Sequence, residues 1–190
     1  MAMTVQRRKD DRIPHVFVHK VADIRGGVSV KASELGGDYL HEGAVLSAPD
    51  NGVCHVVKVA KVVAAVSDND TTIKVKKGHN FAIGNVVMAD ENSKAYAITA
   101  IDSKSSKEFD TITVGTAIGK IAIGGFIIEA AAVSADGKSA LKYQPLAIVG
   151  TGKQVDINSN IITDAWLIGV TKDNQLPACV AKHLTGIINY

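Results

Sequence analysis

A β-structured segment occurs twice in the middle of this chain, and this repeat constrains the fold more than any other feature. Each copy consists of three short apolar segments, at 63–68, 72–75 and 82–88 in the first and at 98–102, 112–114 and 122–128 in the second. The offset between copies grows from 35 (98 − 63) to 40 residues (122 − 82), because the connection at 103–110 is longer in the second copy. A repeat that varies in length at its turns is typical of successive β-hairpins in one small architecture. We therefore predict a repeated central β-unit at about 62–128.

Composition supports a β-rich core. The chain has 190 residues, enough for one domain or two small ones, and 46% of them are hydrophobic although only 5% are aromatic. Such a core has to be built from valine, isoleucine and alanine, of which the β-branched residues favour pleated sheets. We therefore predict a mainly β protein, with antiparallel hairpins that form a small barrel or sandwich and with few short helices.

Turn residues divide the chain into short strands. Asp50-Asn51-Gly52 predicts a type I′ hairpin turn, because Asn-Gly accepts the positive φ angles of that turn. Gly84 and Gly124 take equivalent places in the two copies of the repeat, each before a strand, and we expect a positive φ at both. Residues 56–66 are valine-rich and predict a strand, with a helix as the alternative because Lys58 and Lys61 are three residues apart.

Three local expectations concern the second half of the chain. Pro145 interrupts the apolar segment 141–150 and predicts an edge strand there. The segments 166–170 and 178–181 flank the polar residues 172–175 and predict another hairpin. The apolar residues 184–190 predict a final strand that pairs into a sheet.

Residues 1–14 differ from the rest of the chain, since they are polar and charged and lack any periodicity. We predict a flexible charged arm at 1–14, followed by a β-rich body at 15–190. Arg7, Arg8, Lys9 and Arg12 outnumber Asp10 and Asp11, so the arm is either a solvated tail or a docking element for an acidic partner surface. These four basic residues are the candidate partner-docking residues.

We find no motif that predicts catalysis or cofactor binding. Gly137-Lys138-Ser139 ends like a phosphate loop, but Ala132 stands where the first glycine is required. His15 and His19 have helical metal-ligand spacing in a segment that predicts a strand, so we expect the histidines to be solvent-facing or structural. Cys54 and Cys179 lack a Cys-Xaa-Xaa-Cys partner and predict two buried free thiols. The sequence thus predicts no catalytic, cofactor-binding or metal site and no enzymatic activity.

The overall charge and hydropathy argue against two further classes of partner. The chain carries 21 basic and 19 acidic residues, a balance that does not favour nucleic-acid binding. No apolar segment reaches the roughly 18 residues of a membrane span, and no apolar segment of a signal peptide follows the basic residues near the start. We therefore expect neither nucleic acid nor membrane as a partner and synthesis in a cytoplasm.

Two segments carry a resemblance to a known group of proteins. These are Tyr39-Leu40-His41-Glu42-Gly43-Ala44-Val45-Leu46, which follows a first strand and a Gly-Gly turn, and Trp166-Leu167-Ile168-Gly169-Val170 with the later Leu176-Pro177-Ala178-Cys179-Val180. Both resemble segments of head-associated structural proteins of tailed bacteriophages and prophages, the decoration and head-fibre group. The resemblance covers the two ends of the chain, and the chain is longer than the smallest decoration proteins.

The resemblance implies a β-rich, non-enzymatic virion protein that decorates or stabilises the capsid head through multivalent attachment. It implies a homo-oligomer, with a trimer favoured, that is made in the bacterial host cytoplasm and binds the phage major capsid protein or other virion proteins. No functional residue is transferred by the resemblance. The alternative interpretation is a carbohydrate- or surface-binding β module of a fibre or adhesion protein, with Tyr96 and Tyr143 as the candidate aromatic platform. A virion-associated hydrolase is the third, weakest alternative.

Overall fold

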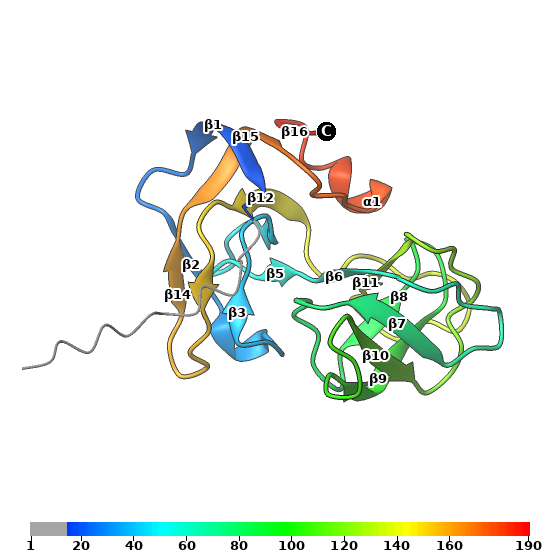
Figure 1. Ribbon diagram of the computed structural model, residues 1–190. Helices are drawn as coiled ribbons and strands as arrows, with labels where there is room; N and C mark the ends of the chain where they lie inside the picture. Colours follow the sequence, from blue (N-terminus) through cyan, green and yellow to red (C-terminus); the bar gives the residue numbers. More distant parts are fainter. Residues whose placement is uncertain (1–14) are drawn as a thin grey trace, which may run out of the picture.

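The computed structural model describes residues 15–190, and two six-stranded sheets form its framework. In Figure 1 the two sheets belong to two lobes, one built from both ends of the chain and the other from its middle. The only α-helix of the described part of the chain is the four-residue α1. The prediction of a mainly β chain with antiparallel sheets and few short helices is confirmed. Neither sheet closes into a complete barrel over residues 15–190, which favours the sandwich alternative.

The first lobe combines the start and the end of the chain. Its main sheet has the order β1-β15-β12-β4-β5, and β16 adds to β15 as the one parallel strand. Two small ladders, β13 with β3 and β14 with β2, extend the lobe. The strands of the main sheet are β1 (Phe17–Asp23), β4 (Val45–Ser47), β5 (Val56–Val57), β12 (Pro145–Val149), β15 (Ala165–Thr171) and β16 (Ile187–Asn189). The other elements are β2 (Val28–Val30), a 3-10 turn (Ala32–Glu34), β3 (Tyr39–Leu40), β13 (Lys153–Gln154), β14 (Ile161–Thr163) and α1 (Ala178–Ala181).

The second lobe is a single antiparallel sheet of order β6-β11-β8-β9-β10-β7. The two end strands of this order meet at one isolated bridge between Val62 and Val75. Every buried residue of its core cluster lies between Ala60 and Ile127, so this lobe has a core of its own. Its strands are β6 (Val59–Lys61), β7 (Thr72–Lys76), β8 (Val86–Met88), β9 (Ala95–Asp102), β10 (Phe109–Val114) and β11 (Phe126–Glu129).

The two copies of the repeat interlock within this second sheet. Strand β7 of the first copy pairs with β10 of the second, and β8 pairs with β11. Each copy also presents one turn to the backbone of a buried residue: Gly84 N donates to Ile98 O, and Gly124 N donates to Val62 O, both at 2.9 Å. The structure therefore makes Val62, and not Val63, the equivalent of Ile98. Corresponding strands pair with each other, so the repeat is not a simple series of hairpins.

The first segment of the first copy is not a strand. The chain leaves β6 at Lys61 and then makes single bridges, from Val62 to Val75 and from Val66 to Ile121. Because successive residues of this segment reach different neighbours, no continuous ladder forms. Val63 between them is 39% exposed, whereas Val62 is buried.

The turn predictions agree well with the structure. Asn51 and Gly52 both have positive φ, and Asp50 and Val53 exchange backbone hydrogen bonds across them, as a hairpin turn requires. Strands β5 and β6 form within 56–61, so the strand prediction for 56–66 was right for this part and the helix alternative was wrong. Residues 62–66 make only isolated bridges, so the prediction was wrong there. The final strand also forms, as β16.

Two local predictions were wrong. The segment 178–181 is not a strand but helix α1, which begins after Pro177, a residue suited to the start of a helix. Strand β12 is not an edge strand, because it lies between β15 and β4. It tolerates Pro145 because proline is its first residue, where a missing N–H costs the ladder little.

Three apolar clusters hold the molecule together. One is the core of the second lobe, and another lies inside the first lobe around Val30, Leu40 and Val149. The third joins the lobes, since it combines Ile148 of the first sheet with Ile128 of the second and with Val180 of α1. The free thiols Cys54 and Cys179 are both buried, as predicted. Within the described residues no helix has the length and apolar character of a membrane span.

The equivalent glycines of the repeat provide a test of the fold. Gly84 and Gly124 have φ of 89° and 82°, as expected, and a Cβ added at either would meet no atom closer than 3.8 Å. The penalty for a side chain there is therefore conformational rather than steric. We expect Gly84→Val and Gly124→Val each to lower the free energy of unfolding by more than about 1 kcal/mol. Urea denaturation measures this.

Gly115 is the matched control, because its φ is outside the positive range and an added Cβ would lie 3.7 Å from Thr99. We expect Gly115→Val to cost clearly less. Equal losses at the three positions would contradict the conformational explanation.

Candidate functional site

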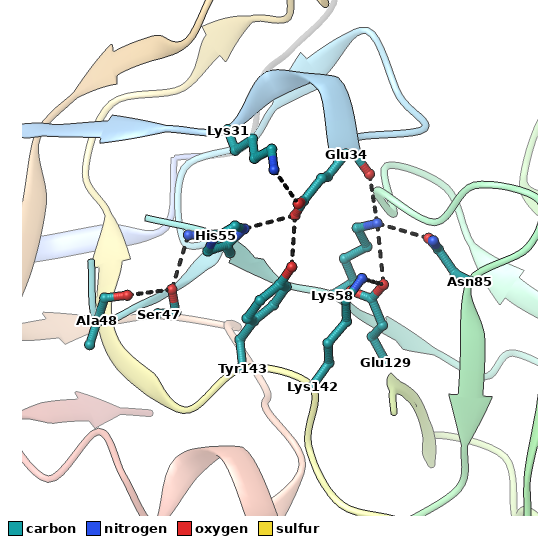
Figure 2. A network of polar contacts seen from close by, with 10 residues as sticks. All are labelled: Lys31, Glu34, Ser47, Ala48, His55, Lys58, Asn85, Glu129, Lys142 and Tyr143. Atoms are coloured by element: carbon teal, nitrogen blue, oxygen red, sulfur yellow. Dashed lines mark hydrogen bonds and ion pairs between the residues drawn. The ribbon is translucent and has the colours of Figure 1, made fainter. Parts of the chain in front are cut away.

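None of the candidate docking residues can be placed. Arg7, Arg8, Lys9 and Arg12, and with them the whole predicted arm at 1–14, lie outside the described residues 15–190. The polar chemistry of the described part of the chain is concentrated where the two lobes meet. It comprises a buried network around Lys58 (Figure 2) and an adjacent cleft.

Lys58 is the centre of the buried network. It lies between β5 of the first sheet and β6 of the second, and its side chain is only 1% exposed. The ammonium group donates to the backbone oxygen of Glu34 at 2.6 Å and to Asn85 Oδ1 at 2.8 Å. It also lies 3.5 Å from the carboxylate of Glu129, whose side chain is 2% exposed. The ammonium group therefore links residues of both lobes.

Glu129 holds a second lysine as well. Lys142 Nζ donates to Glu129 Oε1 at 2.9 Å, while the buried Oε2 has no hydrogen-bond partner within residues 15–190. Burial lowers the pKa of Lys58, and the attraction of Glu129 only partly offsets this effect. Burial acts to lower the pKa of Lys142 as well. The hydrogen bond and ion pair of Lys142 with Glu129 outweigh this effect of burial and raise the pKa of the amine.

A second group of polar contacts extends the network into the first lobe, around Glu34. Its carboxylate contacts His55 Nδ1 at 2.9 Å, accepts from the Tyr143 hydroxyl at 3.1 Å and pairs with Lys31 at 3.2 Å. The rings of His55 and Tyr143 are stacked, with centroids 4.2 Å apart. Partial burial works to raise the pKa of Glu34, but the hydrogen bonds from His55 and Lys31 outweigh it and lower that pKa. Figure 2 shows these side chains converging from separate segments of the chain.

The network is arranged to hold the lobes together. The Lys58 amine is enclosed by three acceptors and its side chain is only 1% exposed, so its hydrogen-bonding capacity is used within the network. Tyr143, one of the two tyrosines proposed as a glycan platform, has one face covered by His55 and its hydroxyl bound to Glu34. Tyr96, the other, is half-buried against the core of the second lobe.

A cleft of about 400 Å³ lies beside the network, with walls from both lobes. Its floor is the extended segment 56–61, which runs from one sheet into the other. On the second lobe, β7 contacts this segment at the bridge from Val75 to Val62 and then diverges, so that residues 76–80 form one wall. The first lobe contributes the turn at 41–44, the loop at 172–176 and the residues His15 and Val16 to the lining. Lys61 Nζ donates to Gln175 Oε1 at 2.5 Å across it.

Burial favours the neutral form of two histidines that line the cleft, His41 and His79. Burial, helped by the positive charge of Lys76, lowers the pKa of His41. Burial also lowers the pKa of His79. The carboxylate of Asp110, 3.3 Å from the ring, acts to raise that pKa but does not compensate for the burial. Buried nitrogens of both rings lack a hydrogen-bond partner among the described residues. Sequence reasoning missed that both histidines line one cleft, because His41 and His79 are far apart in the chain.

Neither a metal site nor a relationship to a known protein identifies a function for the described residues. Among residues 15–190 no three His, Cys, Asp or Glu side chains are grouped so that they could hold a metal ion. His15, whose spacing from His19 was considered for metal binding and not favoured, contacts the Glu42 carboxylate at 3.0 Å. Burial raises the pKa of the Cys179 thiol to about 11, which makes it a poor nucleophile. No family model, curated protein or solved structure matches the chain.

The Lys58 network provides a test of how the lobes are joined. We expect Lys58→Met to lower the free energy of unfolding by about 3 to 5 kcal/mol, because the buried Glu129 carboxylate loses one of its two cations. The double variant Lys58→Met with Glu129→Gln should lose less than the sum of the single variants. Urea denaturation of the four proteins measures this coupling.

The exposed pair of Lys138 and Asp136, whose side chains are 81% and 62% exposed, is the control. We expect Lys138→Met to change stability by less than about 1 kcal/mol. A loss at Lys58 no larger than at Lys138 would rule out a structural role for the network.

The buried histidines predict a pH dependence of stability. For His41 and His79 the folded-state pKa lies below the ordinary value near 6.5, so protonation favours the unfolded chain. Their contribution is complete above about pH 6.5 and is lost as the pH falls below that value. We expect urea denaturation to give a lower stability at about pH 5.5 than at about pH 7.5.

Substitution identifies the groups responsible. We expect His41→Gln and His79→Gln each to reduce the loss between these two pH values, whereas His19→Gln, on the exposed strand β1, should leave it unchanged. An identical loss in all three variants would assign the pH dependence to other groups.

Proposed function

We propose that this chain is a non-enzymatic structural protein of a tailed-phage virion, which decorates or stabilises the capsid head as a homo-oligomer. The proposal is supported by the sequence resemblance and by one structural observation, an apolar strand group at the end of the first sheet. We define the strand group as β1, β15 and β16. Trimeric association is favoured by the resemblance alone.

The strand group exposes an unusual share of apolar side chains. Six of the thirteen large hydrophobic residues that the described chain exposes lie on these adjacent strands or directly after β16: Val18, Val21, Leu167, Ile168, Ile188 and Tyr190. Strand β1 is the end strand of the sheet order, and most of its residues are exposed. A free strand edge that carries valines is a liability for a monomer and favours pairing with another chain.

This surface fits a protein that acts in many copies. Symmetric copies that bury a strand edge against one another form a closed assembly, and several copies bound to one shell gain avidity without a strong single site. We commit to a second copy of this chain as the occupant of the strand group. Other surfaces, including the basic residues of 1–14, would then bind the capsid shell.

The alternative function, a glycan-binding module, stays a proposal of lower support. It needs an exposed aromatic platform, and Tyr143 is engaged in the network described above. Glycan-array binding that is abolished by Tyr96→Ala would favour it.

The oligomer is tested by light scattering coupled to size-exclusion chromatography. We expect a single oligomeric species for the full chain and a shift towards the monomer for Val18→Lys with Ile188→Lys, because charges at the strand group oppose its burial. Ile123→Lys, at an exposed turn of the second lobe, is the control and should leave the oligomer intact. A monomeric full chain, or equal behaviour of both variants, would contradict this use of the strand group.

Attachment to the shell is tested by co-sedimentation with phage heads. We expect the full chain to sediment with heads and the binding to weaken as salt rises past physiological strength, where the screening length is about 8 Å. Deletion of residues 1–14 should weaken attachment and flatten its salt dependence. Unchanged attachment and salt dependence would reduce that segment to a solvated tail, and a chain that never sediments with heads would refute the proposed function.

A further inference from the structure

The lining of the inter-lobe cleft is basic when its two walls are taken together. Lysines 58, 61, 76, 77 and 172 line it, against the acidic residues Glu42 and Asp173. The Glu42 carboxylate is already engaged, because it accepts from the backbone N–H groups of Val16 and Phe17. The lining therefore has a clear excess of positive charge, although the whole chain carries only +2.

Two of these lysines are available for a ligand. Lys76 on the second lobe and Lys172 on the first are exposed, and neither forms an ion pair with another residue of 15–190. Lys58 and Lys77, in contrast, are paired with Glu129 and Asp110. The available cations thus belong to different lobes, and both line the cleft together with the extended segment 56–61.

The floor offers backbone as well as charge. Strand β6 is the end strand of the second sheet and pairs with β11, and on its other side no ladder forms among residues 15–190, because the nearest bridge joins Val62, just after β6, to Val75. Residues 59–61 of β6 line the cleft. An unpaired strand edge accepts an extended chain by main-chain hydrogen bonding.

We propose that this cleft binds a short acidic peptide segment of a partner protein in an extended conformation, along the β6 edge and between Lys76 and Lys172. Carboxylates spaced along an extended chain reach lysines on both walls at once, whereas a single small anion would meet only one of them. The chain's own residues 1–14 do not complement the cleft, because their basic side chains outnumber the acidic ones. The cleft lining shares no residue with the strand group, although it adjoins β1 and β15, so peptide binding does not require the proposed oligomer.

A nucleic acid fits this cleft less well. Single-stranded nucleic acids are held by aromatic side chains on which bases stack, and Phe126 is the only Phe, Tyr or Trp in the lining. Phe126 also packs against the apolar cluster between the lobes, so its ring is not free for stacking.

The test uses the full chain and a fluorescein-labelled hexaglutamate peptide, with binding followed by fluorescence anisotropy at low ionic strength. We expect saturable binding that weakens with salt. Lys76→Glu with Lys172→Glu should weaken it by about tenfold or more, because both walls then repel the ligand. Lys104→Glu with Lys107→Glu is the matched control, since these exposed lysines lie in the loop between β9 and β10, outside the lining. It changes the net charge by the same amount and should retain nearly full affinity.

The outcomes are decisive in both directions. Absence of binding, or equal weakening in the two charge-reversal variants, would overturn the site. Equal or tighter binding of a hexathymidine oligonucleotide would assign the cleft to nucleic acid instead and overturn the peptide proposal. Thermal unfolding checks that the variants fold. If the double charge reversal does not fold, Lys76→Gln with Lys172→Gln replaces it. We expect this neutral double variant to lose less affinity, but still more than the control.

Discussion

The ion pair between Lys58 and Glu129 determines how the two halves of this molecule sit together. The chain crosses from the first lobe to the second at Lys58, and it begins its return after Glu129, the last residue of β11. Each crossing therefore carries one member of the pair. Because isolated charges are very costly inside a protein, both groups have to be surrounded by partners in one arrangement. Glu34 and Asn85, from the two lobes, complete the coordination of the lysine.

The cleft follows from that arrangement. The extended segment 56–61 has to serve two sheets, with β5 paired in one and β6 in the other. The walls on either side of it then come from different lobes, and they can meet only where a specific contact joins them. The hydrogen bond from Lys61 to Gln175 is one such contact, and the hydrogen bond from the Gly36 N–H to the backbone oxygen of Asn80 is another. The cleft lies beside these contacts and is lined by lysines of both lobes.

Reactive groups lie in the interior of the protein, whereas its surface carries features of association with other chains. Its most reactive groups, the Lys58 amine and the two thiols, are buried and held by packing or ion pairs. What it presents outwards is an exposed strand with apolar side chains and a basic cleft, both of which are features of association with other chains. These two outward features are the observations on which the proposed associations of the chain are based.

Local features of the fold could be predicted from the sequence because their causes are local. Asn51-Gly52 forms its turn, the valine-rich residues 56–61 form strands, and Gly84 and Gly124 adopt positive φ at equivalent turns. Each of these depends on the conformational preferences of a few neighbouring residues. Composition likewise determined that the chain is mainly β, since it supplies β-branched residues and few aromatic ones.

Tertiary structure decided everything that depends on which distant segments meet. The central position of β12, the helical turn after Pro177 and the pairing of corresponding strands between the two repeats are set by neighbours far away in the chain. The same is true of the candidate site. Lys58 and Lys61 read only as polar positions in an apolar strand, and Glu129 is 71 residues (129 − 58) from Lys58. The sequence determined which groups can carry charge, but only the fold brings them to one boundary, because burial and pairing arise between segments and not within them.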